Sequence, residues 1–227
     1  MAGKSPPSPL SGNDRFAIDP PDRCFLSYAT MENEVSLHFD ALADRWDAIA
    51  VHPSSRVDYV LSRLGDERGK TILDLGCGTG VLLPYLLGMV GPEGHVIALD
   101  ISARMLGVAR SKHSAPNLEF IHADFLSWVS VDKPDVIVAY SCFPHFREPS
   151  AFWQAASTNL RPGGRALVAH IEGRGTINAL HARRANSVSF PLAPANAYVD
   201  GLKRQGFELE YSEDSEDYFI LLTVLKG

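Results

Sequence analysis

Residues 72–80 read Ile-Leu-Asp-Leu-Gly-Cys-Gly-Thr-Gly. The apolar run followed by three alternating glycines predicts a strand, then a tight loop, then the N-terminus of a helix that begins near Val81. Gly76, Gly78 and Gly80 allow the backbone to come close to a ligand, and the first turn of the helix offers unpaired N–H groups. The stretch therefore predicts a ligand-binding loop at the end of a strand.

The glycine spacing narrows the class of ligand. It is G-x-G-x-G, whereas the loop that seats a dinucleotide pyrophosphate is G-x-G-x-x-G. Asp74 would repel a pyrophosphate, and its carboxylate suits a cationic ligand that carries an amino-acid group. A nucleotide-dependent oxidoreductase therefore stays only as an alternative, as does a glycine-rich turn in some other α/β protein.

Two motifs carry a resemblance to a known family. ILDLGCGTG resembles the first motif of the class I S-adenosylmethionine-dependent methyltransferases. Leu160-Arg-Pro-Gly-Gly164, followed by an apolar strand, is similar to the small-molecule enzymes of ubiquinone and menaquinone biosynthesis. The resemblance covers residues 70–170 and implies S-adenosylmethionine as the cofactor. It also implies a set of residues around the cofactor's methionine moiety: Asp74, Gly76, Cys77, Gly78, Thr79 and Gly80.

Beyond the loop, strand and helix patterns alternate, as is typical of a doubly wound parallel sheet. Strands are predicted at 95–100, 118–123, 135–140, 165–170, 207–211 and 218–225, and helices at 102–110, 149–160, 174–184 and 195–205. The last two strands flank an acidic turn, and the resemblance makes them an antiparallel hairpin. The predicted fold is α/β: a Rossmann-like, doubly wound, seven-stranded, mostly parallel sheet with an antiparallel C-terminal hairpin and helices on both faces.

The chain is predicted to form one domain with an extension. Residues 1–30, rich in Pro, Ser, Gly and Asp, are predicted to be a flexible leader, and 31–227 the methyltransferase domain. Apolar residues recur at steps of three and four from Met31 to Ile49, which predicts an amphipathic helix, and a second helix follows Pro53. These parts divide the domain into an N-terminal helical cover (31–66), a cofactor-binding core (70–170), and acceptor-side helices with the closing hairpin (171–227).

Composition excludes several classes of protein. The 227 residues carry a formal net charge of −6, which argues against a nucleic-acid partner. The three cysteines, at 24, 77 and 142, have no disulfide or metal spacing and fit a reducing compartment. No apolar run approaches the ~18 residues of a membrane-spanning helix. We therefore expect a cytoplasmic protein with a small-molecule acceptor, and the sequence offers no prediction of oligomeric state.

Further cofactor contacts are expected at the ends of the next strands. Asp100 ends a strand twenty residues after Gly80, where an acid in a doubly wound fold accepts hydrogen bonds from ribose hydroxyls. Ile101 would pack on the adenine. The resemblance implies that Asp124 and Phe125 hold the adenine amino group and ring beside the backbone of Ala123. It also implies that the segment from Tyr140 to Phe146 borders both methyl donor and acceptor, with Tyr140 toward the cofactor and Phe143 toward the substrate.

Polar residues are expected to converge at the acceptor side. His145 and His170 follow adjacent central strands, and Arg174, Asn178 and His181 share one face of the next helix. The three histidines are the catalytic candidates, and Arg174 and Asn178 are candidate substrate ligands. A solvated surface helix with one satisfied core histidine is the alternative. Three histidines could also ligate a metal, but no tight ligand spacing supports this, so no metal is predicted.

The prediction is therefore an enzyme that transfers a methyl group from S-adenosylmethionine to a small-molecule acceptor by in-line displacement. A protein that binds S-adenosylmethionine without catalysis stays as the alternative, beside the oxidoreductase. No residue pattern identifies the acceptor or the accepting atom.

Overall fold

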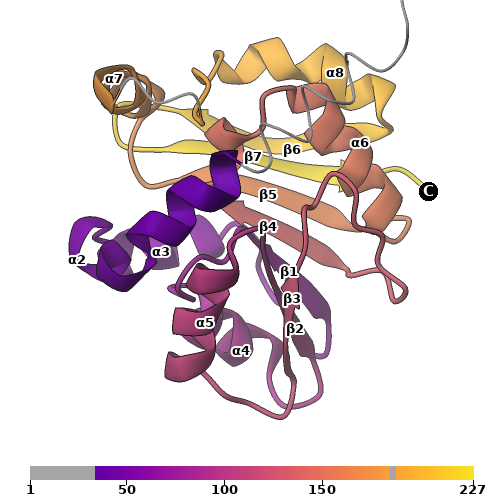
Figure 1. Ribbon diagram of the computed structural model, residues 1–227. Helices are drawn as coiled ribbons and strands as arrows, with labels where there is room; N and C mark the ends of the chain where they lie inside the picture. The colour runs from indigo at the N-terminus through magenta and orange to yellow at the C-terminus, as the bar shows by residue number, and fades with distance from the viewer. Residues whose placement is uncertain (1–33, 185–187) are drawn as a thin grey trace, which may run out of the picture.

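Seven strands form one sheet at the centre of the molecule (Figure 1). The computed structural model describes residues 34–184 and 188–227, so the predicted leader lies outside the described residues. The strands are β1 (Thr71–Leu75), β2 (His95–Asp100), β3 (Leu118–His122), β4 (Val136–Tyr140), β5 (Arg165–His170), β6 (Phe207–Asp214) and β7 (Phe219–Leu225). Their order is β3-β2-β1-β4-β5-β7-β6. Strands β1 to β5 pair in parallel, and β7 runs antiparallel between β5 and β6, which confirms the predicted fold class.

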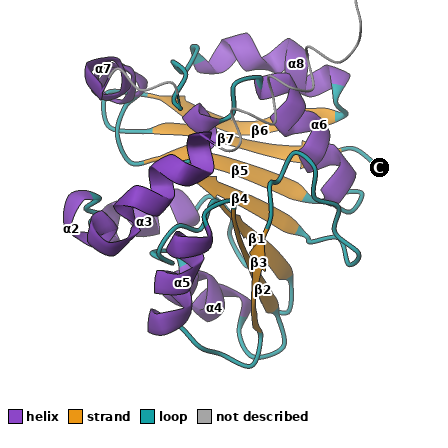
Figure 2. Cartoon of the chain, viewed as in Figure 1, coloured by secondary structure: helices purple, strands orange, loops and turns teal. Residues whose placement is uncertain are grey.

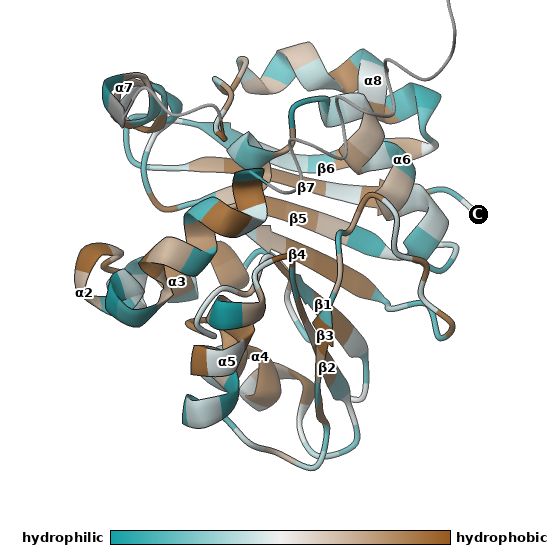
Figure 3. Cartoon of the chain, in the orientation of Figure 1, coloured by the Kyte–Doolittle hydropathy of each residue, from teal (hydrophilic) through white to brown (hydrophobic). Residues whose placement is uncertain are grey.

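Helices cover both faces of the sheet (Figure 2). They are α2 (Trp46–Ile49), α3 (Ser54–Leu61), α4 (Leu83–Val90), α5 (Ala103–Lys112), α6 (Pro149–Asn159), α7 (Arg174–Arg184) and α8 (Val199–Arg204). Short 3₁₀ turns are η1 (Ala43–Arg45), η2 (Phe143–His145) and η3 (Ala195–Tyr198). The central strands are mostly apolar (Figure 3), as strands buried on both sides must be.

Each face of the sheet has its own hydrophobic core, because successive side chains of a strand point to opposite faces. On β1, Leu73 and Leu75 join a core that includes Trp153 of α6, whereas Ile72 joins the core on the other face, with Leu86 of α4. All five side chains are at most 2% exposed. The two cores hold the carboxyl ends of the central strands in fixed positions.

The predicted helix from Met31 to Ile49 is interrupted. Residues 34–42 are helical, η1 follows, and α2 completes the segment. A 3₁₀ turn has 3.0 residues per turn where an α-helix has 3.6, so one such turn shifts the apolar stripe too little for the sequence pattern to reveal it. A similar 3₁₀ turn, η3, begins the predicted helix at 195–205.

The strand β6 continues to Asp214, so the acidic run at 212–217 begins inside a strand. Asp214 pairs in register with Phe219 of β7, and its carboxylate accepts a hydrogen bond from the Ala195 backbone N–H. These tertiary partners extend a strand whose acidic sequence favours a turn.

The N-terminal segment 34–49 lies against α5 and the glycine loop. Four polar side chains spaced four, four and three apart make the contacts. These are Ser36 Oγ to the Ile101 carbonyl, Asp40 to Ser102 Oγ and the Arg104 N–H, Asp44 to Arg104, and Asp47 to Thr79 Oγ1 and Lys112. These hydrogen bonds and ion pairs therefore come from one polar stripe of the segment. Among the helices that the structure describes, none combines the length and apolar character needed to cross a membrane.

Candidate functional site

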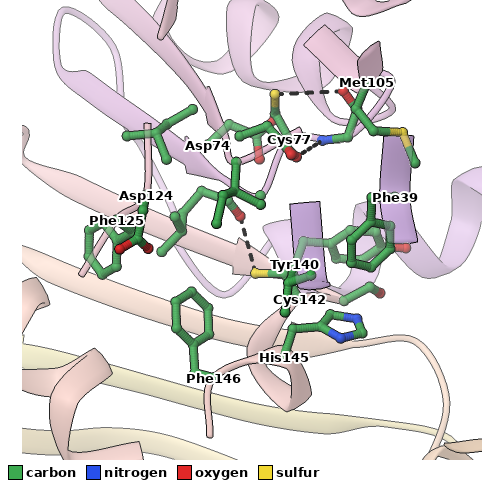
Figure 4. A pocket seen from close by; sticks show the side chains of 18 of the residues that line it. Phe39, Asp74, Cys77, Met105, Asp124, Phe125, Tyr140, Cys142, His145 and Phe146 are labelled. Atoms are coloured by element: carbon green, nitrogen blue, oxygen red, sulfur yellow. Dashed lines mark hydrogen bonds between the residues drawn. The ribbon is translucent and has the colours of Figure 1, made fainter. Parts of the chain in front are cut away.

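A pocket opens at the carboxyl ends of the central parallel strands (Figure 4). It lies where the strand order changes direction, between β1 and β4, which is the usual ligand position in open α/β sheets. Many of the predicted cofactor and catalytic residues line it. They are Asp74, Gly76, Cys77, Gly78, Thr79, Asp100, Ile101, Ala123, Asp124, Phe125, Tyr140 and His145. In Figure 4, Asp124 and Phe125 lie at one side, and Phe39, Tyr140 and His145 lie at the other.

The three glycines of the loop differ in the space around them. Gly76 and Gly78 have φ of 68° and 56°, in the left-handed region that favours glycine. A Cβ at Gly76 would lie 2.8 Å from the Cβ of Cys142, whereas a Cβ at Gly78 would meet only Trp46, at 3.8 Å. Gly80 is outside the pocket lining, and a Cβ there would lie 2.7 Å from the His113 ring. Gly80 thus allows close packing, and Gly78 leaves open space for a ligand.

Asp74 brings an uncompensated carboxyl group to the pocket. It is 2% exposed, and its Oδ2 has no hydrogen-bond partner among the described residues. Burial, together with the nearby charge of Asp100, raises the pKa of Asp74 to about 8. A buried polar atom without a partner in a pocket indicates a missing ligand group. The cationic ammonium of a methionine moiety fits this position.

Asp124 offers a second acceptor of the same kind. Its Oδ1 accepts the Leu126 N–H at 3.1 Å, and its Oδ2 is buried without a hydrogen-bond partner in the described part of the chain. A donor such as an adenine amino group fits this oxygen. The two unpaired carboxylate oxygens therefore fit the two ends of an S-adenosylmethionine molecule.

Asp100 connects the loop to the end of β2. Its two carboxylate oxygens accept the N–H groups of Gly78 and Ser102, each at 2.8 Å. Burial raises its pKa, and these two hydrogen bonds oppose the rise. Asp100 is 6% exposed and lines the pocket. The carboxylate therefore holds the loop in shape and also faces the space in which a ribose would bind.

The raised pKa of Asp74 leads to a pH prediction. Near pH 7 this carboxyl group is protonated, and a bound ammonium group should lower its pKa, so cofactor binding should release about one proton. Calorimetry in buffers of different ionisation enthalpy measures this release. Asp74→Asn, which cannot ionise, should abolish it. An equal binding enthalpy in all buffers for the wild type would contradict the prediction.

The raised pKa of Asp74 also determines how the stability of the ligand-free protein changes with pH. The folded pKa is raised, so the contribution of Asp74 to stability is fully present below about pH 4 and is lost as the pH rises toward about 8. The free energy of unfolding of the ligand-free protein should fall over this range, and the fall should be smaller in Asp74→Asn.

The three candidate histidines lie near one another, but they differ in access to the pocket. His145, at the end of η2, lines the pocket, and its Nδ1 lies 2.8 Å from the Val188 carbonyl oxygen. A carbonyl only accepts, so Nδ1 carries a proton; in the neutral form of the ring, the lone pair is then on Nε2. The ring centroid of His145 lies 4.9 Å from that of Phe39 and 5.8 Å from that of His181.

His170 is 3% exposed at the end of β5 and is outside the pocket lining, as is His181. Burial, with smaller effects of His145 and His181, lowers the pKa of His170 to about 3. His170 is therefore neutral at physiological pH, and its ring centroid lies 6.2 Å from that of Phe219. The catalytic roles predicted for His170 and His181 remain predictions.

The predicted substrate ligands make contacts elsewhere. The guanidinium of Arg174 binds the carboxylate of Asp214, with Nε 3.0 Å from Oδ2. The side-chain amide of Asn178 accepts the Leu192 N–H and donates to the Leu192 carbonyl, at 2.8 and 2.9 Å. Phe143 is 2% exposed and packs among aromatic rings, with Phe152 at 4.9 Å. None of these three predicted ligands is in the pocket lining, so their substrate roles remain predictions.

Other residues in the lining were not predicted as site residues. Val35, Phe39 and Trp46 come from the N-terminal segment, where the apolar spacing predicts one face of an amphipathic helix in the helical cover. Cys142 and Phe146 lie in the segment already expected to border the acceptor. His52 lies in a connector with no motif, and no sequence signal pointed to it.

No metal site is evident in the ranges 34–184 and 188–227: no three His, Cys, Asp or Glu side chains there are grouped so that they could hold an ion.

Comparisons with known proteins identify sequence relatives of this chain. Residues 72–164 match the family described as "Methyltransferase domain". The chain is 30% identical over 144 residues to the ubiquinone biosynthesis O-methyltransferase of Aeromonas salmonicida, which covers 59% of each chain. It is 32% identical over 170 residues to the malonyl-[acyl-carrier protein] O-methyltransferase of Halalkalibacterium halodurans, covering 69% of this chain and 60% of the relative. The chain thus spans about three-fifths of the length of these curated relatives.

The fold is similar to that of solved methyltransferases. The magnesium protoporphyrin IX methyltransferase ChlM from Synechocystis PCC 6803, solved with bound SAH, aligns with a TM-score of 0.65. The alignment covers 86% of this chain and all of that one, at 18% sequence identity. At this identity the likeness concerns the fold alone.

Proposed function

We propose that this chain is a class I S-adenosylmethionine-dependent methyltransferase and that it methylates an oxygen atom of a small-molecule acceptor. The match of residues 72–164 to the methyltransferase-domain family supports this proposal. The relatives named above are O-methyltransferases, which supports oxygen as the accepting atom. We place the protein in the cytoplasm, without a nucleic-acid partner, in line with its net charge of −6.

The carboxyl oxygen Oδ2 of Asp74, which is buried in the pocket without a hydrogen-bond partner among the described residues, is the observation that carries the proposal. Because this carboxyl group lies beside the glycine-rich loop, the site favours a cationic ligand that carries an amino-acid group. Asp100 would hold the ribose, and Asp124, Ala123, Phe125 and Ile101 would hold the adenine. S-adenosylmethionine, when bound, supplies an electrophilic methyl group on a sulfonium centre.

The protein's own task would be to align the acceptor and exclude water. Phe39 and Phe146 provide apolar walls at the acceptor side, and His145 provides a polar group between them. We propose that His145 hydrogen-bonds the acceptor through Nε2, since Val188 fixes the proton on Nδ1. The N-terminal segment 34–49 would cover the bound ligands.

The test uses the full chain, S-adenosylmethionine with a labelled methyl group, and a small-molecule extract. Label should appear in one or a few small molecules, with an equal amount of S-adenosylhomocysteine. Asp100→Ala should lose this activity at limiting cofactor. Cofactor binding by calorimetry without any label transfer would instead favour a binding protein that does not catalyse.

A further inference from the structure

His52 and Tyr140 form a polar pair in the wall of the pocket. His52 lies in the connector between α2 and α3, and Tyr140 ends β4. The Nδ1 of His52 lies 2.9 Å from the Tyr140 hydroxyl oxygen, and the two ring centroids are 5.3 Å apart. Both residues line the pocket. The pair joins two residues that are 88 positions apart in the sequence, at the edge of the sheet that carries Asp74.

The charges around the pair favour a neutral imidazole beside a protonated phenol. Burial lowers the pKa of His52, and the Asp47 carboxylate opposes this shift. Burial, with the charge of Glu172 and a weaker effect of Tyr85, raises the pKa of Tyr140, and Ser141 opposes the rise. A neutral imidazole can take up a proton, and Asp47 is placed to stabilise the imidazolium that results.

We propose that His52, oriented by Tyr140, is the general base of the reaction, and that the acceptor enters the pocket as a neutral hydroxyl group. This inference rests on the proposed function. It assigns proton removal to His52 and leaves to His145 the hydrogen bond that holds the acceptor. The required tautomer has the Nδ1 proton donated to the Tyr140 oxygen, with the lone pair on Nε2.

The proposed methyl transfer is coupled to proton transfer to His52. Nε2 of His52 takes the proton of the acceptor hydroxyl as the oxygen lone pair forms the new bond to the methyl carbon. The bond from that carbon to sulfur breaks, and its electron pair stays on sulfur. One positive charge therefore passes from the sulfonium group to the His52 imidazolium, which then gives its proton to water.

The assignment separates two classes of acceptor. A carboxylic acid is already ionised at neutral pH, so its methylation needs no base, whereas a phenol or alcohol stays protonated. A neutral imidazole fixed in the pocket serves a hydroxyl acceptor and has no task with a carboxylate. Phe39 and Phe146 in the same lining fit an aromatic ring, so we use phenols as probes.

The experiment compares 4-methylphenol with 4-nitrophenol at about pH 8.5, where the first is protonated and the second is ionised. His52→Ala should lower kcat with 4-methylphenol by about 10²- to 10⁴-fold and leave kcat with 4-nitrophenol within about fivefold. Tyr140→Phe should give a smaller loss with the same selectivity. His95→Ala is the matched control. His95 begins β2, at the end of the strand away from the pocket, so this variant should have the wild-type kcat with both phenols.

Two readouts do not depend on turnover. S-adenosylmethionine affinity should be unchanged in His52→Ala, and NMR titration of the ligand-free wild type should place the His52 pKa below the ordinary histidine value of about 6.5. Equal losses with both phenols, or a selective loss in His145→Ala alone, would overturn the assignment. If the extract screen succeeds and the labelled product is a methyl ester of a carboxylic acid, the hydroxyl assignment fails and the proposed function stands. Failure of the extract screen, with neither phenol methylated, would overturn both.

Discussion

Replacing Asp100 with alanine is expected to weaken S-adenosylmethionine binding by about 1.5 to 3 kcal/mol, or roughly 10- to 150-fold in Kd. The carboxylate accepts the N–H groups of Gly78 and Ser102, so its removal leaves both donors without their acceptor and loosens the loop. It also removes the charged acceptor proposed for the ribose hydroxyls. Isothermal calorimetry on the folded variant measures the effect.

Two further variants serve as comparisons for the affinity of Asp100→Ala. Asp100→Asn keeps one side-chain oxygen but loses the charge, so its affinity should lie between those of the wild type and the alanine variant. Asp58→Ala, at an exposed position on α3, should bind as the wild type does. A folded Asp100→Ala protein with a Kd within about twofold of the wild type would remove Asp100 from the cofactor site.

Trp153→Ala is expected to lower the free energy of unfolding by about 3 to 5 kcal/mol. The indole is 1% exposed, and its ring centroid lies 4.9 Å from that of Phe152, 5.3 Å from that of Phe207 and 6.0 Å from that of Phe143. Removing it leaves a cavity between α6 and the sheet. Urea denaturation without cofactor measures the loss.

The adjacent residue provides the control. Gln154 is exposed on the same helix, and Gln154→Ala should change stability by no more than about 0.5 kcal/mol. Trp153→Phe should cost much less than alanine, because a ring remains and the indole Nε1 has no hydrogen-bond partner within the described residues. A loss below about 1 kcal/mol in Trp153→Ala would mean that the core refills the space.

The parts of the fold that the sequence predicted are those with a local signal. The strand at Thr71–Leu75, the glycine loop after it and the apolar strand at Val136–Tyr140 each have a pattern within a few residues, and the structure has all three. The 3₁₀ turn at Ala43–Arg45 had no such signal, because it changes the helical phase only slightly.

The residues of the candidate site also divide into those with a local sequence signal and those without one. Asp74 lies next to the last residue of β1 and Asp100 is the last residue of β2, so strand prediction was enough to place them at the pocket. His52 meets Tyr140 only through the tertiary fold, and no spacing in the sequence connects them. Arg174 illustrates the opposite case: its helical face was polar as expected, but its partner is Asp214, forty residues later on β6.

Docking of segment 34–49 and binding of a ligand in the pocket are thermodynamically coupled. The polar stripe of the segment contacts α5 and the loop, while Val35, Phe39 and Trp46 line the pocket. Any ligand that binds better when this segment is docked must strengthen the docking by the same free energy with which docking strengthens the ligand. The side chains of the pairs Asp44–Arg104 and Asp47–Lys112 are 34% to 76% exposed, so salt weakens both pairs. For a ligand that binds better when the segment is docked, ionic strength should therefore change the affinity even if the ligand touches neither pair.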